Sequence, residues 1–123
     1  MTPALLATYG IGRAAFGVAL LIAPAAAGRM LAGDGATTSD AQAFLHGIGA
    51  RDVGLGLGTL GAVRTRRSTR GWLIAGVLAD AGDAAGIARA WHGLDPDKRA
   101  PGLAFAGTAA TAGLALLVAT ATT

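Results

Sequence analysis

Charged residues interrupt three apolar stretches of this sequence. Arg51 and Asp52 lie at the centre of "GIGARDVGLGLGTL", where glycine and aliphatic residues fill most other positions. Asp80 and Asp83 lie three residues apart in a second stretch, and Arg13 lies in a third. An arginine between carboxylates can hold one of them ionised while another keeps its proton, and such a pair can act as base and acid. These five residues are therefore the candidates for chemistry.

Helical geometry predicts how these residues meet. Asp80 and Asp83 share one face of a helix, because residues three apart are neighbours there. Arg51 is the expected clamp between them, since its planar guanidinium can engage two carboxylates. Asp52 points about 100° away from Arg51 and is expected to meet Arg13. In a catalyst, Asp80 is assigned as the base, Asp52 or Asp83 as the acid, and Arg51 as the orienting residue.

Two further polar residues are expected to complete the site. Tyr9 lies one helical turn from Arg13, and His46 lies about a turn and a half from Arg51. With Arg13, they are assigned to substrate binding. No metal ion is expected, because His92 is far from His46 in sequence and the chain has no cysteine. No cofactor is expected, so acid-base chemistry is what remains.

Four apolar segments must position these residues. They cover approximately residues 3–23, 41–63, 71–91 and 102–119, and the loops between them cover residues 24–40, 64–70 and 92–101. Pro24 is expected to end the first segment. Each segment is close to the roughly 20 residues that a helix needs to cross a bilayer. Short connections favour antiparallel neighbours. The prediction is an all-α fold: one domain, a four-helix transmembrane bundle of up-down-up-down topology.

The composition also favours a membrane location over the alternative, a soluble helical protein. Only 14% of the residues are charged, against about 25% in ordinary soluble domains. A charge at the centre of a membrane helix costs about 2.5 to 3.5 kcal/mol, so five unpaired charges would cost more than about 12 kcal/mol. The five central charges should therefore pair inside the bundle.

The basic residues cluster in one predicted loop. The net charge is +3, and four arginines lie in "RTRRSTR": Arg64, Arg66, Arg67 and Arg70. Such a loop beside apolar segments is typical of a cytoplasmic loop next to anionic membrane lipid, and nucleic acid is not an expected partner. The positive-inside rule then places both termini in the cytoplasm, in a bacterial inner (plasma) membrane.

Glycine spacing predicts close helix contacts. Small residues let membrane helices approach closely. The spaced glycines that resemble such packing faces are Gly10 and Gly17, Gly54 and Gly58, and Gly82 and Gly86.

Three blocks of the chain resemble a known family. They are "YGIGRAAFGVALLIAP", "FLHGIGARDVGLGLGTL" and "VLADAGDAAG", and they resemble a bacterial family of small four-helix membrane proteins of unassigned function, which carries a domain-of-unknown-function label. The matching residues are Arg13, Gly17, Pro24, Arg51, Asp52, Gly54, Asp80 and Asp83. The chain is more distantly similar to DoxX-like membrane proteins. The resemblance implies a four-helix integral membrane fold and no particular reaction.

Two functional hypotheses fit these residues. The first is an enzyme that acts on a lipophilic small molecule from the bilayer, by epoxide opening or a related hydration or isomerisation. Its combination of two aspartates with an arginine resembles the catalytic residues of limonene-type epoxide hydrolases, as a chemical analogy on an unrelated fold. The alternative is a non-catalytic accessory subunit or small carrier, whose charges fix helix register or relay protons. A carrier would need a homodimer, for which the uncharged last segment could supply the contact.

Overall fold

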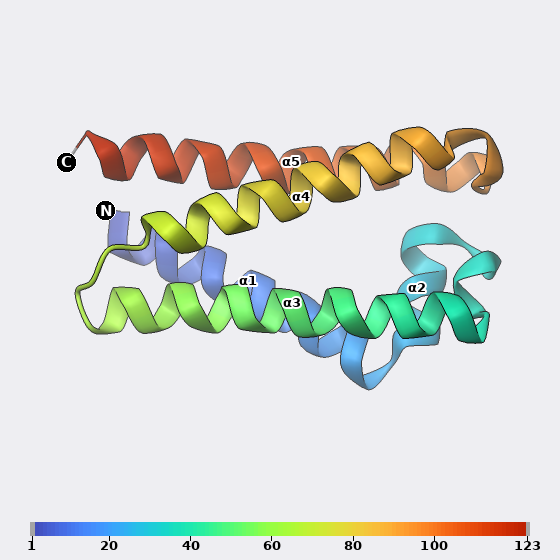
Figure 1. Ribbon diagram of the computed structural model, residues 1–123, viewed down its shortest axis with the longest axis horizontal. Coiled ribbons are helices and arrows are strands. Elements are labelled where there is room, and N and C mark those ends of the chain that lie inside the picture. Colours follow the sequence, from blue (N-terminus) through green and yellow to red (C-terminus); the bar gives the residue numbers. More distant parts are fainter. Residues whose placement is uncertain (1, 123) are drawn as a thin grey trace.

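The chain folds into helices throughout the range that its structure describes. The structure is a computed structural model, and it describes residues 2–122. Its α-helices are α1 (Thr2–Ile22), α2 (Pro24–Ala32), α3 (Ser39–Arg64), α4 (Arg70–Ala90) and α5 (Pro96–Ala121) (Figure 1). Two short 3-10 helices, η1 (Asp34–Thr37) and η2 (Trp91–Gly93), lie in the connections. The all-α class is therefore confirmed.

The predicted four-helix transmembrane bundle is wrong in its helix number, because the described residues form five α-helices. The additional helix is α2, in the segment that was expected to be a loop. Pro24 was expected only to end the first helix. It also begins α2, because proline suits the first helical position, where its missing N–H costs no hydrogen bond. The alanines that follow it favour helix.

The last helix begins earlier than predicted. It starts at Pro96 and continues through Pro101, so most of the expected loop 92–101 is helical. Pro96 takes the first position, where an N–H group has no partner within the helix, whereas Pro101 is the sixth residue and removes one backbone hydrogen bond. The remaining long helices begin and end within two residues of their predicted bounds.

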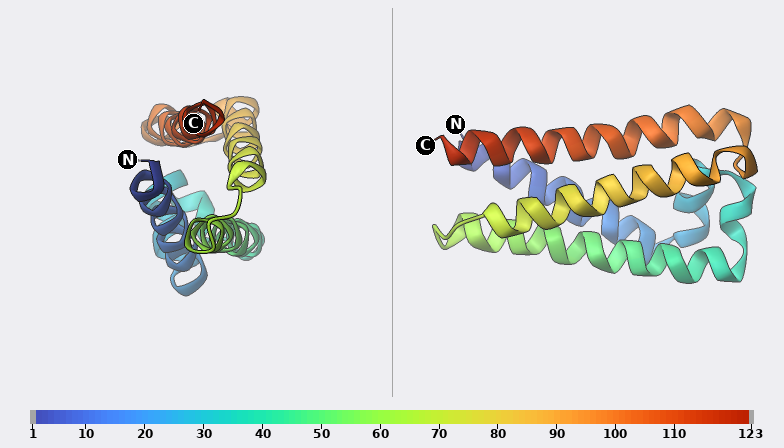
Figure 2. Two further views of the ribbon diagram at one scale, coloured as in Figure 1. Left: turned by 90° about the vertical axis from the view of Figure 1, so that its left-hand side faces the viewer. Right: turned by 45° about the horizontal axis from the view of Figure 1, so that its top comes forward.

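The long helices form two antiparallel pairs that face each other (Figure 2). Helix α1 packs along α3, and α4 packs along α5. The short helix α2 and η1 lie at one end of the molecule, whereas both termini and the turn between α3 and α4 lie at the other end (Figure 1). A residue on the inner face of α1 or α3, near the middle of the helix, therefore faces the opposite pair across the centre of the molecule.

Glycines bring the backbones of α1 and α3 together. A Cβ atom added to Gly17 would lie 2.5 Å from the carbonyl oxygen of Gly49, and one added to Gly56 would lie 2.5 Å from that of Gly10. Any side chain larger than glycine would force these helices apart. The predicted packing face at Gly10 and Gly17 is thus confirmed.

The other two predicted glycine faces do not form such contacts. Gly54, Gly82 and Gly86 have open space around the position of a Cβ atom. Gly58 packs against the indole ring of Trp72 rather than against a helix backbone. Spacing alone does not show which side of a helix meets a neighbour.

Replacing Gly17 with alanine should therefore destabilise the protein. The added methyl group would meet backbone atoms of α3, which cannot turn aside as a side chain can. We expect a loss of about 1 to 3 kcal/mol in the free energy of unfolding, the usual cost of overpacking. Thermal unfolding of the purified protein in detergent measures it. Gly54→Ala is the matched control, and it should unfold at or above the wild-type temperature. Equal unfolding temperatures for the two variants would contradict the contact.

Within residues 2–122, three helices are long and apolar enough to cross a membrane. These spans are Pro3–Ile22, Arg70–Gly93 and Pro96–Ala121. Large apolar side chains point outward along the long helices, among them Ile11, Leu78 and Leu114. In a soluble helical protein such side chains would form the core. Helix α3 is not among these three candidate membrane spans, because its charged residues lower its mean hydropathy.

Candidate functional site

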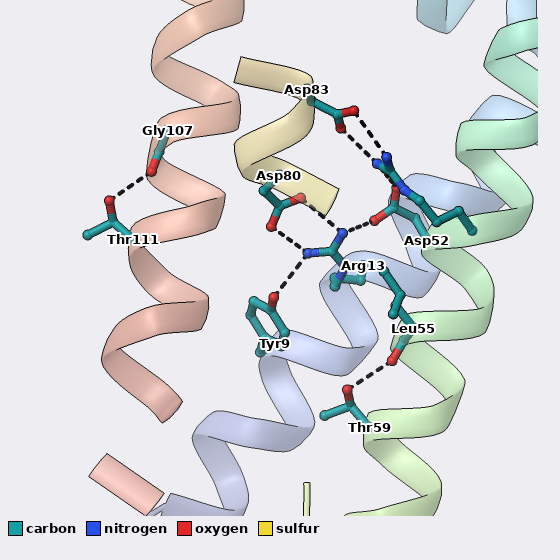
Figure 3. Close-up of polar contacts among 10 residues, drawn as sticks. Tyr9, Arg13, Asp52, Leu55, Thr59, Asp80, Asp83, Gly107 and Thr111 are labelled. Carbon is teal, nitrogen blue, oxygen red and sulfur yellow. Dashed lines mark hydrogen bonds and ion pairs between the residues drawn. The ribbon is translucent and has the colours of Figure 1, made fainter. Parts of the chain in front are cut away.

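The centre of α1 is joined to two other helices through Arg13 (Figure 3). Its Nη1 donates a hydrogen bond to Asp80 Oδ2 on α4 at 2.6 Å, and its Nη2 donates to Asp80 Oδ1 at 3.0 Å. Nη2 also donates to Asp52 Oδ1 on α3. The planar guanidinium thus holds one carboxylate with two bonds and a second carboxylate with one.

A second arginine continues the chain of charges. Arg51 donates from Nη1 to Asp83 Oδ1 at 3.0 Å and from Nη2 to Asp83 Oδ2 at 2.7 Å. Its Nη2 also donates to Asp52 Oδ2 at 2.9 Å. The resulting order of alternating charges is Asp80, Arg13, Asp52, Arg51, Asp83, and we call these five residues the charged network.

The network confirms two of the expected pairs and corrects a third. Asp52 does meet Arg13, and Arg51 does meet Asp83. Arg51 does not clamp Asp80 and Asp83 together, because Asp80 pairs with Arg13 instead. Gly76 of α4 leaves room for Arg13 beside Asp80, because a Cβ atom at Gly76 would lie 3.3 Å from Arg13 Nη1.

The same glycines place the first ion pair. Arg13 follows Gly10 by three residues and precedes Gly17 by four. Asp52 has the same spacing to the two glycines of α3 that contact them. In an antiparallel pair held at both glycine contacts, the residues between them must lie opposite each other. This repeated spacing is a sequence signal for the Arg13–Asp52 pair.

The network is most buried at Arg13, Asp52 and Asp80, which are 8%, 2% and 5% exposed. The side chains of Arg51 and Asp83 are about one third exposed, so this end of the network is its accessible end. The formal charges of its two arginines and three aspartates sum to −1.

Tyr9 joins the network, but His46 does not. The hydroxyl of Tyr9 accepts a hydrogen bond from Arg13 Nη1 at 3.0 Å. A Cβ atom added to Gly76 of α4 or Gly113 of α5 would lie 2.8 or 3.0 Å from that hydroxyl oxygen, so both glycines make room for it. His46 is exposed on α3, and its side chain makes no hydrogen bond to the residues that the structure describes. Its expected role in substrate binding has no geometric support.

A cavity of about 460 Å³ lies between the two helix pairs. Tyr9 and all five residues of the charged network contribute to one part of its wall. Most of the remaining wall is apolar, with side chains such as Leu20, Ile48 and Ile87. Cavities of this size and character are typical of small-molecule sites.

The cavity opens on the side where α1 faces α5. Exposed residues of both helices line it there, including Gly12 of α1 and Thr108 and Ala112 of α5. The rings of Phe16 and Phe105 bridge the same two helices, with their centroids 5.3 Å apart. Sequence reasoning missed these residues. The position of Phe16, three residues after Arg13, was the available signal, whereas α5 carries no charge near its centre to draw attention to Phe105.

Two nitrogen atoms of the network are left without partners. Arg13 Nε and Arg51 Nε are buried and have no hydrogen-bond acceptor among the described residues. Buried donors usually have an acceptor, so these atoms mark places where the network can still bind an oxygen atom. Within residues 2–122, no group of three or more histidine or acidic side chains is arranged to hold a metal ion.

The fold and the site together define a small helical protein with three candidate membrane spans and a buried Arg/Asp network on the wall of an apolar cavity. Comparison of the chain with protein-family models, curated proteins and solved structures found no match. Functional inference therefore starts from the geometry of this site.

Proposed function

We propose that this chain is an integral membrane protein that binds a lipophilic small molecule in the cavity and acts on it by acid-base chemistry. One observation carries the proposal: five charged side chains, three of them almost fully buried, form part of the wall of a cavity that is otherwise mostly apolar. Buried charges are costly and need a reason. Ion pairs that served only to fix helix order could have been packed without a cavity beside them.

The position of the opening supports access from the bilayer. It lies between α1 and α5, and both helices are apolar enough to span a membrane. A molecule dissolved in lipid could reach the network through this opening without crossing water. We therefore propose a lipophilic molecule with one polar group that accepts hydrogen bonds, such as an epoxide oxygen.

Epoxide hydration is the reaction that we propose first, with ring opening or isomerisation of related substrates as variants. Asp80 takes a proton from water, whose oxygen forms a bond to one ring carbon while the bond from that carbon to the ring oxygen breaks. The ring oxygen takes a proton from Asp83 or Asp52. The proton gained by Asp80 restores the acid afterwards, so no other reactant is consumed. Arg13 holds Asp80 and takes the orienting role that the sequence suggested for Arg51.

The charge of the network supports the presence of an acid. The formal charges of the two arginines and three aspartates sum to −1, and we propose that one aspartate carries a proton when the ligand is bound. Asp83 is the better placed of the two candidate acids, because it lies at the accessible end of the network and lines the cavity. A neutral carboxyl group there could donate its proton to a ligand.

We further propose that the protein lies in a bacterial inner membrane with both termini in the cytoplasm. The arginine-rich turn between α3 and α4 lies at the same end of the molecule as both termini (Figure 1). Loops rich in arginine stay on the cytoplasmic side of membranes.

The alternative is a non-catalytic accessory subunit or carrier. It is favoured by a different observation, namely that all six carboxylate oxygens of the network already accept hydrogen bonds from arginine. A closed set of this kind fixes helix register well. A carrier would act as a homodimer, and the small residues Ala104, Gly107 and Ala115 line a groove on α5 that could receive a second copy.

An assay of epoxide turnover tests the proposal. The purified protein in phosphatidylcholine vesicles is incubated with limonene oxide or stilbene oxide, and diol formation is followed by gas chromatography. We expect diol formation at least about 100-fold faster than in empty vesicles, since one well-placed acid or base contributes about that much. A rate equal to that of empty vesicles with lipophilic epoxides of several sizes would contradict the catalytic proposal and favour the alternative.

A further inference from the structure

We propose a second binding site, for a phosphate group, at the end of the bundle where α3 turns into α4. A pocket of about 560 Å³ lies there. It shares no lining residue with the central cavity. The site is therefore separate from the charged network, and the proposal does not depend on the function proposed above.

The polar side of this pocket carries three arginines. Arg66, Arg67 and Arg70 line it, and none of them forms an ion pair with a carboxylate within residues 2–122. All three are exposed, so their guanidinium groups are available to a ligand. Guanidinium groups match the geometry of phosphate oxygens and can bind them with two parallel hydrogen bonds.

A largely buried threonine in the same pocket has no hydrogen-bond partner for its hydroxyl group within residues 2–122. Thr69 is 7% exposed and lines the pocket. It stands immediately before α4, yet its side chain does not cap the helix and makes no hydrogen bond to the described residues. Buried polar side chains in proteins nearly always have a partner. An oxygen atom of a ligand would supply it.

The start of α4 adds to the attraction for an anion. This helix has 21 residues, and its first N–H groups point toward the turn; that of Arg70 donates to Ser68 Oγ at 3.3 Å, and those of Gly71 and Trp72 have no partner in the helix. The aligned peptide dipoles place a partial positive charge at this end, which favours phosphate. Three features thus meet at one place: unpaired guanidinium groups, an unpaired hydroxyl group and a helix N-terminus.

The other side of the pocket is apolar. Pro3 and Leu6 of α1 and Leu117 and Ala121 of α5 line it. Both helices are candidate membrane spans. A phosphate bound at the arginines could therefore belong to an anionic phospholipid whose chains lie along α1 and α5, or to a soluble phosphate compound. The chemistry that is recognised is the same in both cases.

Lipid nanodiscs distinguish these sources. The protein is placed in nanodiscs of phosphatidylcholine alone or of phosphatidylcholine with phosphatidylglycerol. In a separate arm, inorganic phosphate is added to the nanodiscs of phosphatidylcholine alone. Lipid binding is measured by native mass spectrometry, as lipid that stays on the protein when the protein is released from the nanodisc. Binding of either ligand is also measured as a rise in the unfolding temperature of the protein. Retention of phosphatidylglycerol without an effect of phosphate identifies a lipid site. Protection by inorganic phosphate alone identifies a soluble ligand. Failure of both arms overturns the proposal.

Substitutions test whether the pocket, rather than the charge of the turn, binds phosphate. Arg67→Gln should weaken binding about tenfold, as expected for a charge-assisted hydrogen bond. Thr69→Val should weaken it about fivefold, because it removes only the hydroxyl group. Arg64→Gln removes the same charge from the same turn, but Arg64 does not line the pocket, and its affinity should stay within about twofold of wild type. Equal losses in Arg64→Gln and Arg67→Gln, with none in Thr69→Val, would show a surface-charge effect and overturn the site.

Discussion

Replacing Arg13 with glutamine is expected to cost about 3 to 5 kcal/mol of unfolding free energy, as is usual when one partner of a buried ion pair is removed. Within residues 2–122, Asp80 is ion-paired only to Arg13, so it would lose this partner and remain a buried carboxylate. Asp52 would keep its bond to Arg51. The loss should therefore come mainly from Asp80, and thermal or denaturant unfolding in detergent would measure it.

A second substitution shows whether that reasoning holds. Adding Asp80→Asn to Arg13→Gln removes the unpaired charge, so the double variant should be more stable than Arg13→Gln alone. Arg29→Gln is the control, because Arg29 and Asp34 form an exposed pair, and exposed pairs contribute about 0 to 1 kcal/mol. If Arg13→Gln were as stable as Arg29→Gln, Arg13 could not be the centre of a buried network.

Replacing Asp80 with asparagine is expected to lower epoxide turnover by about a thousandfold while the protein stays folded. Asparagine has nearly the shape of aspartate and retains an oxygen that can accept a hydrogen bond from Arg13. It cannot take a proton from water, and loss of a general base costs about 100-fold to 10,000-fold in rate. The rate of diol formation and the unfolding temperature should be measured on the same preparation. Asp97→Asn, which changes an exposed aspartate of α5, controls for the loss of one negative charge.

The catalytic and structural accounts differ in the outcome of this experiment. In the structural account, Asp80→Asn and Arg51→Gln both lower the unfolding temperature strongly, and there is no turnover to lose. In the catalytic account, Asp80→Asn lowers the rate far more than it lowers stability. A folded Asp80→Asn variant with the wild-type rate would exclude Asp80 as the base.

The long helices and most of the network could be predicted from local features of the sequence. Apolar runs of spanning length located α1, α3 and α4 within two residues of their ends, because that pattern depends on the chain alone. The spacing of Gly10 and Gly17 predicted the face by which α1 packs on α3. The angle of about 100° between Arg51 and Asp52 on their helix predicted that Asp52 would meet Arg13, and the cost of unpaired charges predicted that the five charges would pair inside the bundle.

What could not be predicted depends on how helices far apart in the sequence are placed. Helix α2 was missed because a proline was interpreted only as a stop, although it also suits the start of a helix. Arg51 was predicted to pair with Asp80, whereas Arg13 forms that pair. The sequence could not distinguish the two arginines, because it gives no distance between helices. The cavity and its opening depend on the separation of the two helix pairs, which no local pattern records, and the position of Phe105 beside Phe16 follows from that separation.

The most direct test of the central claim is the environment of Gly12, at the opening of the cavity. The chain has no cysteine, so Gly12→Cys provides a single site for a nitroxide spin label, and the space around Gly12 is open. In reconstituted vesicles, we predict that oxygen dissolved in lipid collides with this label often and that a water-soluble nickel complex collides rarely. A label at Gly35→Cys, within η1 at the end of the molecule, should show the reverse. If the nickel complex reached Gly12 as readily as Gly35, the opening would face water, and a site supplied from the bilayer would be contradicted.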